Sequence, residues 1–193
     1  MRKKQVKKPF LTIKEMVYCA MFTALVAAGA FLNIPLPGGI PISLQFLFTN
    51  LAGVLLGRKK GLTSILVYII LGLSGIPIFT AGGGIGYVLK PSFGYIIGFA
   101  AGAWLAGYIS ESGKGTIMSY IWASLADMAV VFAIGLLYFY LLMAYYAGTP
   151  ISAEKLFLTC FVPFAPADIV YCVLSGFLAK RLQPVLQKSL TAV

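Results

Sequence analysis

The chain alternates long apolar runs with short segments rich in glycine, proline or basic residues. Several runs approach or exceed the roughly 20 residues that a helix needs to cross about 30 Å of hydrocarbon. They predict helices at about 12–33, 43–57, 62–75, 92–110, 116–146 and 156–182. Pro163 and Pro166 interrupt the last one. We therefore expect one all-α membrane domain over residues 1–193, with six transmembrane helices and a basic cytoplasmic arm at 1–11.

Composition and charge agree with a membrane protein. Hydrophobic residues make up 60% of the chain and charged residues only 10%, far from the balance of a soluble domain. The net charge of +10 would suit nucleic acid, but the lysines and arginines form short clusters beside apolar runs and no continuous basic face. We therefore expect membrane lipid, and no nucleic acid, as a partner. The three cysteines fall inside apolar runs and are expected to pack as small residues.

The distribution of basic residues predicts the orientation, because Lys and Arg accumulate in short cytoplasmic loops. With six spans and both termini inside, every lysine and arginine except Lys90 and Lys155 falls on the inner side. The prediction is a multi-pass protein with an N-in and C-in topology. One alternative is that the first run is a secretory signal, since it has a basic start and the cleavage-like tripeptide Ala28-Gly29-Ala30.

Missing residue types exclude several kinds of chemistry. The chain has no histidine, which removes zinc-protease motifs and Ser-His-Asp triads, since each needs an imidazole. It has no Walker A motif either, so ATP energy would have to arrive through a partner. We expect no enzyme activity, no metal and no cofactor.

Lys90 is an exception to the charge rule that needs a reason. It lies between a predicted helix start and a loop that contains Gly82, Gly83, Gly84 and Gly86. A helix N-terminus offers a positive dipole and free N–H groups, so this position favours binding of a carboxylate. The alternative is that Lys90 snorkels to outer water. The glycines suggest a gating loop that closes over a bound solute, or else a flexible outer loop without contacts.

Acidic residues inside a membrane are the other candidates, because burying a charge there is costly. Asp168 lies about 12 residues into a helix that enters from the outer side, roughly 18 Å down if the helix is regular, and we expect it to face a cavity. Asp127 lies near the middle of the fifth helix, where a structural role and ligand binding are equally open. Glu15, Glu111 and Glu154 lie near helix ends and are read as interfacial charges.

A cavity lined by both Lys90 and Asp168 would offer a cation for a carboxylate and an acceptor for N–H groups. Aromatic residues are expected nearby: Phe79, Tyr87, Phe93 and Tyr95. Such a pocket suits a small amphipathic acid.

The first predicted helix has one narrow face of small residues. Ala20, Ala24 and Ala28 recur at four-residue spacing, which lets another helix approach closely. The face fits internal packing and docking of a partner subunit equally well.

Several short pieces of the chain occur in a recognisable order. They are PISLQFLFTNLAGVLLGRKKG at 41–61, GLSGIPIF at 72–79, GGGIGY at 82–87, PSFGYIIGF at 91–99 and PFAPAD at 163–168. With the six spans and the topology, this order resembles BioY, the biotin-specific substrate-binding subunit (S component) of energy-coupling factor (ECF) transporters. The resemblance implies a six-helix fold in a prokaryotic cell membrane that captures biotin from outside. It also implies association with one transmembrane coupling subunit and two ATPases, with the alanine face docking the coupling subunit.

The resulting hypothesis is a biotin-binding membrane subunit that performs no covalent chemistry. Lys90, with Ser92 and the adjoining helix N-terminus, holds the biotin carboxylate. Asp168 accepts from the ureido N–H groups, Gln45 or Tyr87 donates to the ureido carbonyl, and the aromatic residues flank the ring. The opposite orientation, in which the carboxylate and the ureido group exchange their partners, is equally open from the sequence. The alternative function is a solitary carrier or facilitator for another small organic acid.

Overall fold

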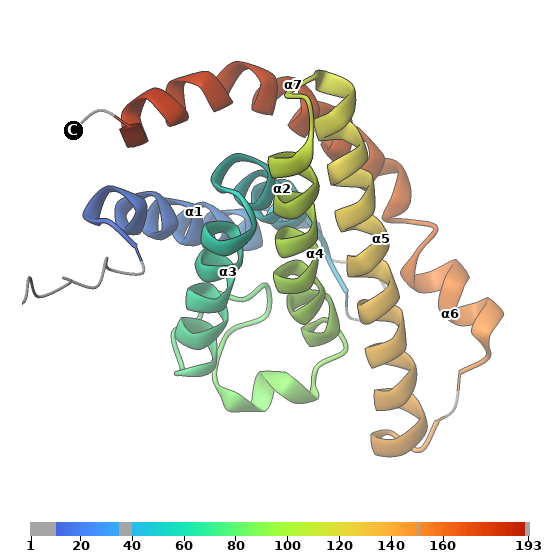
Figure 1. Ribbon diagram of the computed structural model, residues 1–193. Helices are drawn as coiled ribbons and strands as arrows, with labels where there is room; N and C mark the ends of the chain where they lie inside the picture. Colours follow the sequence, from blue (N-terminus) through green and yellow to red (C-terminus); the bar gives the residue numbers. More distant parts are fainter. Residues whose placement is uncertain (1–10, 35–39, 150, 192–193) are drawn as a thin grey trace, which may run out of the picture.

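The structure is a computed structural model that describes residues 11–34, 40–149 and 151–191. The basic arm expected at 1–11 therefore lies almost wholly outside the described residues. Helices form nearly all of the described chain (Figure 1). They are α1 (Ile13–Phe31), α2 (Gln45–Leu56), α3 (Arg58–Leu73), α4 (Phe93–Ser112), α5 (Ile117–Leu141), α6 (Ala153–Cys160) and α7 (Ala165–Thr191).

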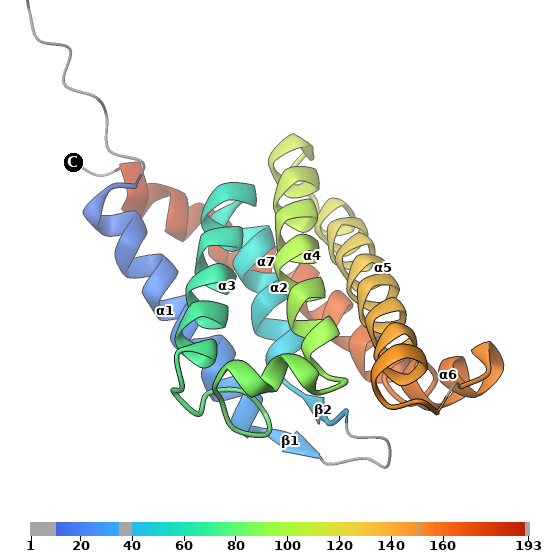
Figure 2. The ribbon, with the colours of Figure 1, turned by 90° about the horizontal axis from the view of Figure 1, so that it is seen from below.

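Short irregular elements connect these helices. The 3-10 helix η1 (Ile85–Leu89) precedes α4, and the π-helical segment η2 (Leu142–Tyr146) extends α5. Strands β1 (Asn33–Ile34) and β2 (Ile42–Ser43) pair antiparallel between α1 and α2. The sequence predicted only a break at this hairpin. Figure 2 shows the hairpin and η1 at the same end of the bundle.

Four of the described helical segments are long and apolar enough to cross a membrane. They are α1, α4, α5 together with η2, and the part of α7 from Ala165 to Ser189. Helix α2 has 12 residues, which is about 18 Å at 1.5 Å per residue. Helix α3 has 16 residues and begins with three basic ones. The described chain is therefore a helical membrane-type fold in which these two helices are shorter than the four candidate spans.

The predicted helices at 43–57 and 62–75 leave RKKG, residues 58–61, as a turn between them, and the structure corrects this. RKKG forms the first turn of α3, and the break falls one residue earlier, at Gly57, whose φ of 83° is in the left-handed region that favours glycine. The predicted sixth helix is interrupted as expected. It forms α6 and α7, which meet at residues 161–164, and α7 continues past Pro184.

Helix α4 lies in the centre of the bundle, and three of its glycines let α5 approach it closely. Gly94, Gly98 and Gly102 recur every four residues along α4 and face α5. A Cβ atom at Gly98 would lie 2.9 Å from the Val131 Cα, and one at Gly102 would collide with Asp127 Oδ1. Both views show α4 between α3 and α5 (Figures 1 and 2). The sequence carries this small-residue motif, but the prediction overlooked it.

Both ends of the described chain meet at one end of the bundle. The Ser189 carbonyl oxygen in α7 accepts a hydrogen bond from Lys14 Nζ over 3.2 Å. The Ser189 hydroxyl also shares a hydrogen bond of 2.7 Å with the Tyr18 hydroxyl. Helices α1 and α7 are therefore tied together although they lie far apart in sequence.

The glycine contact predicts a stability effect at Gly98. A Gly98→Ala substitution should lower the free energy of unfolding by about 1–3 kcal/mol, because the Val131 backbone cannot move out of the way of the new methyl group. Gly86→Ala is the matched control, since a Cβ there meets nothing within 4 Å. Thermal unfolding of both variants in detergent checks the prediction, and equal melting temperatures for the two would contradict it.

Candidate ligand cavity

A cavity of about 50 Å³ lies where β2, α2, α4, α5 and α7 meet. Its walls are mostly apolar, and the aromatic rings in them are Phe46, Tyr95, Phe99, Phe132 and Phe164. Five polar residues also line it: Ser43, Gln45, Thr80, Ser92 and Asp168. Small-molecule sites usually have this composition but measure about 300–1,000 Å³. The cavity has the composition of such a site but is smaller in this structure.

Four residues expected from the sequence line this cavity: Tyr95 and three polar residues. Gln45 comes from the start of α2, Ser92 precedes α4, and Asp168 lies in the first turn of α7. They are between 47 and 123 positions apart in sequence, so only the packing of the three helices unites them. The prediction missed Ser43 and Thr80, which are small polar residues without a distinctive sequence signal.

Gln45 is connected to the glycine-rich loop through a buried tyrosine. Its Nε2 donates to the hydroxyl oxygen of Tyr68 over 2.6 Å, and the Tyr68 hydroxyl donates to the carbonyl oxygen of Ile78 over 2.9 Å. Gln45 itself is buried. Sequence reasoning missed Tyr68, which lies inside an apolar helix where an aromatic residue gives no signal.

Tyr87 lies directly behind the polar wall of the cavity. Its hydroxyl shares hydrogen bonds with Thr80 Oγ1 at 2.9 Å and with Ser92 Oγ at 3.1 Å. The rings of Phe79 and Phe93 lie on either side of Tyr87, with centroids at 4.6 and 6.5 Å. These three predicted aromatic residues therefore support the cavity from behind and are absent from its lining.

Lys90 lies on the outside of the same loop. Its Nζ donates to the carbonyl oxygen of Ala81 over 2.7 Å and lies 5.0 Å from the centre of the Tyr87 ring. The side chain is exposed and is not part of the cavity lining. In this structure Lys90 thus links two parts of the loop to each other.

The glycine-rich loop is held by specific backbone contacts. Phe79 and Gly82 exchange a pair of backbone hydrogen bonds, and Gly84 N donates to Gly72 O over 2.7 Å. Gly82 and Gly84 have φ of 109° and 94°, which other residues rarely adopt. Gly83 packs against the Ile76 carbonyl, whereas Gly86 has open space around its Cα. The loop therefore has a defined structure, unlike a flexible segment without contacts.

Asp127 belongs to a buried polar cluster and does not line the cavity. Its Oδ2 accepts from Asn50 Nδ2 over 2.7 Å, and Asn50 Oδ1 accepts from the Ser124 hydroxyl over 2.8 Å. All three residues are 0% exposed. The cluster joins α2 to α5 about one turn from the cavity residues on each helix. These contacts match the structural role of Asp127, one of the two alternatives left open by the sequence.

The alanine face of α1 points away from the bundle. Ala20, Ala24 and Ala28 are exposed, so they take no part in packing within the described chain. The opposite face of α1 is tied to α3: Thr23 Oγ1 donates to Ser64 O over 2.8 Å, and the Glu15 carboxylate pairs with Lys60 Nζ at 3.2 Å.

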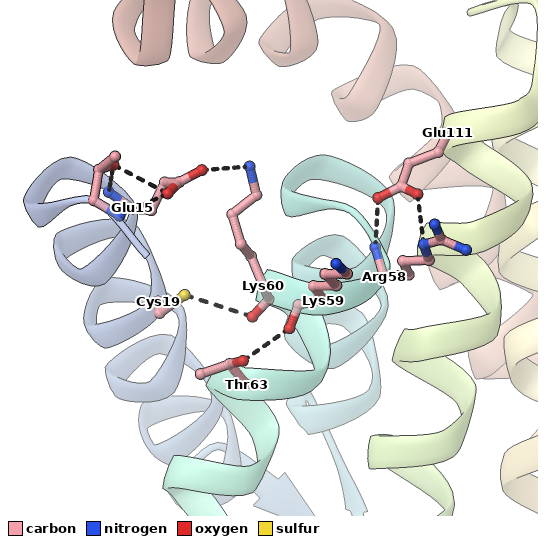
Figure 3. A network of polar contacts seen from close by, with 8 residues as sticks. Glu15, Cys19, Arg58, Lys59, Lys60, Thr63 and Glu111 are labelled. Carbon is pink, nitrogen blue, oxygen red and sulfur yellow. Dashed lines mark hydrogen bonds and ion pairs between the residues drawn. The ribbon is translucent and has the colours of Figure 1, made fainter. Parts of the chain in front are cut away.

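Figure 3 shows that the Glu15–Lys60 pair belongs to a row of polar contacts across three helices. At its other end, Glu111 of α4 accepts from the Arg58 backbone N–H over 2.9 Å and pairs with the Arg58 guanidinium at 3.2 Å. These contacts fix α1 relative to α3 and α4 and keep its alanine face outward.

Comparisons with known proteins agree with one another. The model of the BioY family matches residues 1–188. "Probable biotin transporter BioY" of Lysinibacillus sphaericus is 42% identical over 176 residues, which cover 91% of this chain and 89% of that protein. "Biotin transporter BioY" of Thermotoga maritima is 30% identical and covers 89% of this chain and 96% of that protein.

A solved structure is similar over the same length. The crystal structure of the S-component for biotin from an ECF-type ABC transporter superposes with a TM-score of 0.76 at 27% identity. The match covers 89% of this chain and 92% of the other.

The polar cluster predicts that Asn50 is needed for stability. Asn50→Ala would leave buried oxygens of Asp127 and Ser124 without their partner, which should lower the free energy of unfolding by about 3 kcal/mol. Asn33→Ala serves as the control, because that half-buried amide makes one hydrogen bond, to Ala30 O, at the end of α1. Thermal unfolding in detergent measures both. A loss no larger for Asn50 than for Asn33 would show that the cluster does not stabilise the fold.

Proposed function

We propose that this chain, which belongs to the BioY family, is the biotin-binding membrane subunit of an ECF-type uptake transporter. The observation that carries the proposal is the family match, which extends over nearly the whole chain and includes every residue of the cavity. The comparisons give no support to a solitary carrier for another acid, and the family is one of transporter subunits, not of enzymes.

The cavity chemistry supports biotin as the ligand. Biotin has an apolar ring, a ureido group with two N–H donors and one carbonyl acceptor, and a carboxylate tail. In this proposal the ring lies against the aromatic walls and the Asp168 carboxylate accepts from the ureido N–H groups. Gln45, which keeps one further N–H on Nε2, is the first candidate donor to the ureido carbonyl, and Tyr87 is the second, which reaches the ligand only if the cavity widens past Thr80 and Ser92. Each charge-assisted contact contributes about 1.5–3 kcal/mol, so a few of them with apolar burial suffice for nanomolar affinity.

The carboxylate of biotin is assigned to the outer end of the site, at Lys90 and Ser92. Ser92 lines the cavity and Lys90 lies two residues before it, at the start of α4. For Lys90 to reach the ligand, its ammonium must leave the Ala81 carbonyl and turn inward. The glycine-rich loop would move with it, so binding of the carboxylate and closure of Gly82, Gly83, Gly84 and Gly86 over the ligand are one event.

The arrangement of charges supports a six-helix topology with both termini inside. We assign the spans to α1, α2, α3, α4, α5 and α7. The ion pairs of Arg58 and Lys60 and the contact of Ser189 with α1 all lie at one end of the bundle. Lys90 belongs to the loop at the other end. Because basic residues gather on the cytoplasmic side, the first end is assigned to the cytoplasm and the cavity opens outward in a prokaryotic cell membrane.

The partners proposed for this subunit are one transmembrane coupling subunit and two ATPases, which supply the energy for import. The exposed face of Ala20, Ala24 and Ala28 is the proposed contact with the coupling subunit. Its methyl groups let two helix backbones come close, which is the main source of helix association in lipid.

Ligand binding provides the first test. The purified, ligand-stripped chain should bind biotin with nanomolar affinity by calorimetry. Asp168→Asn should weaken binding by about 10–100-fold, because it removes a charge-assisted contact. Lys90→Ala should weaken it by about tenfold.

Lys155→Ala is the control for the lysine, because Lys155 is the other exposed basic residue expected outside. Circular dichroism should show all variants folded. Absence of biotin binding by the parent chain would overturn the function. If Lys90→Ala binds biotin as tightly as the parent chain, only the proposed role of Lys90 is wrong.

The docking face gives a separate prediction. Ala24→Trp should leave biotin affinity within about twofold, since the side chain points away from the bundle, yet abolish co-purification with the coupling subunit and the ATPases. Leu137→Trp, at an exposed position of α5, is the control and should co-purify normally. Normal assembly of the Ala24→Trp variant would mean that the partner docks elsewhere.

A further inference from the structure

Tyr68 connects the floor of the cavity to the loop that covers it. It lies on α3, is 0% exposed, and does not line the cavity. Its hydroxyl oxygen accepts from Gln45 Nε2 over 2.6 Å, and its hydroxyl hydrogen is donated to Ile78 O over 2.9 Å. One buried hydroxyl group therefore bonds a cavity residue on one side and the loop backbone on the other.

The donor and acceptor roles in these two hydrogen bonds fix the orientation of the Gln45 side-chain amide. A carbonyl oxygen can only accept, so the single hydroxyl hydrogen of Tyr68 is committed to Ile78. The Tyr68 oxygen must then receive an N–H, which orients the Gln45 nitrogen toward Tyr68 and its Oε1 away. Gln45 is left with one N–H and one carbonyl oxygen for the cavity. This donor and acceptor complement the C=O and N–H of a ureido group.

The same tyrosine also anchors the loop through its ring. Phe79 follows Ile78 in sequence and is 1% exposed, and its ring meets the Tyr68 ring edge-on with centroids 5.2 Å apart. The Phe79 ring fills the space that the missing side chain of Gly72 leaves. Displacement of Ile78 and Phe79 would break both the hydroxyl and the ring contact of Tyr68.

We propose that Tyr68 is a positioning residue that couples recognition by Gln45 to closure of the loop formed by residues 76–84. The inference rests on the proposed function and extends it to a residue that does not touch the ligand. When the loop is in place, Tyr68 holds Gln45 in one orientation. When the loop is displaced, Ile78 no longer takes the hydroxyl hydrogen, Gln45 is free to rotate, and the ureido group loses its matched partner.

The test compares Tyr68→Phe with the parent chain. The substitution keeps the ring and removes only the hydroxyl. Biotin should bind about tenfold more weakly, mainly through faster dissociation, as expected for one lost neutral hydrogen bond in a buried network. Tyr120→Phe is the matched control: this tyrosine is also buried, on α5 about 16 Å along the helix from Val131 in the cavity wall, and binding should be unchanged.

Two further measurements separate positioning from a general loss of stability. Gln45→Ala leaves Tyr68 in place, and hydrogen exchange of the amides at 76–84 should nevertheless increase in that variant. In a double-mutant cycle, the loss of biotin affinity from Tyr68→Phe should fall to within twofold when Gln45 is already alanine.

Each outcome has a distinct meaning. If the parent chain fails to bind biotin, the proposed function fails. If the parent binds and Tyr68→Phe binds equally tightly, the role of Tyr68 fails alone. The role of Tyr68 also fails if Tyr68→Phe and Gln45→Ala weaken biotin binding independently, so that their fold-losses multiply in the double variant. It fails as well if hydrogen exchange of the amides at 76–84 is unchanged in Gln45→Ala.

Discussion

The close approach of α4 and α5 is the constraint on which the rest of this structure depends. In lipid, apolar side chains gain little by leaving their surroundings, so helices associate mainly through tight contact. Gly94, Gly98 and Gly102 provide that contact along one side of α4. Because the backbones come together there, Phe132 of α5 reaches the T-shaped contact with Tyr95 of α4 that forms part of the cavity wall. The glycines thus set the shape of the binding site without touching a ligand.

Polar groups inside the bundle have separate tasks. Asn50, Ser124 and Asp127 form a buried cluster in which two hydrogen bonds join α2 to α5, and its contribution is cohesion between helices. The cavity instead places Asp168 against open space. A carboxylate that has no hydrogen bond or ion pair with the described side chains is suited to accept donors from a ligand. The two aspartates therefore differ in their neighbours and in their position, since Asp127 lies within α5 and Asp168 in the first turn of α7.

Much of the site followed from the sequence because the membrane restricts what polar residues can do. Asp168, Gln45 and Ser92 are polar residues in or next to apolar runs, and the structure gathers all three. Other features depend on contacts that a linear pattern does not contain. The orientation of the Lys90 side chain depends on the fold of its own loop. The role of Tyr68 depends on two partners in separate elements. The start of α3 at Arg58 depends on the backbone conformation of Gly57. The run of basic residues that follows Gly57 indicated a turn instead.

Helix α7 carries Asp168 near one end and Ser189 near the other. The separation along the axis is about 31 Å at 1.5 Å per residue, and Ser189 is hydrogen-bonded to α1. One continuous helix thus joins the residue proposed to accept the ureido N–H groups to the helix that bears the alanine face. In the proposed assembly, a partner that displaces α1 would also displace the Ser189 end of α7, and a rigid helix would carry that movement to the Asp168 end.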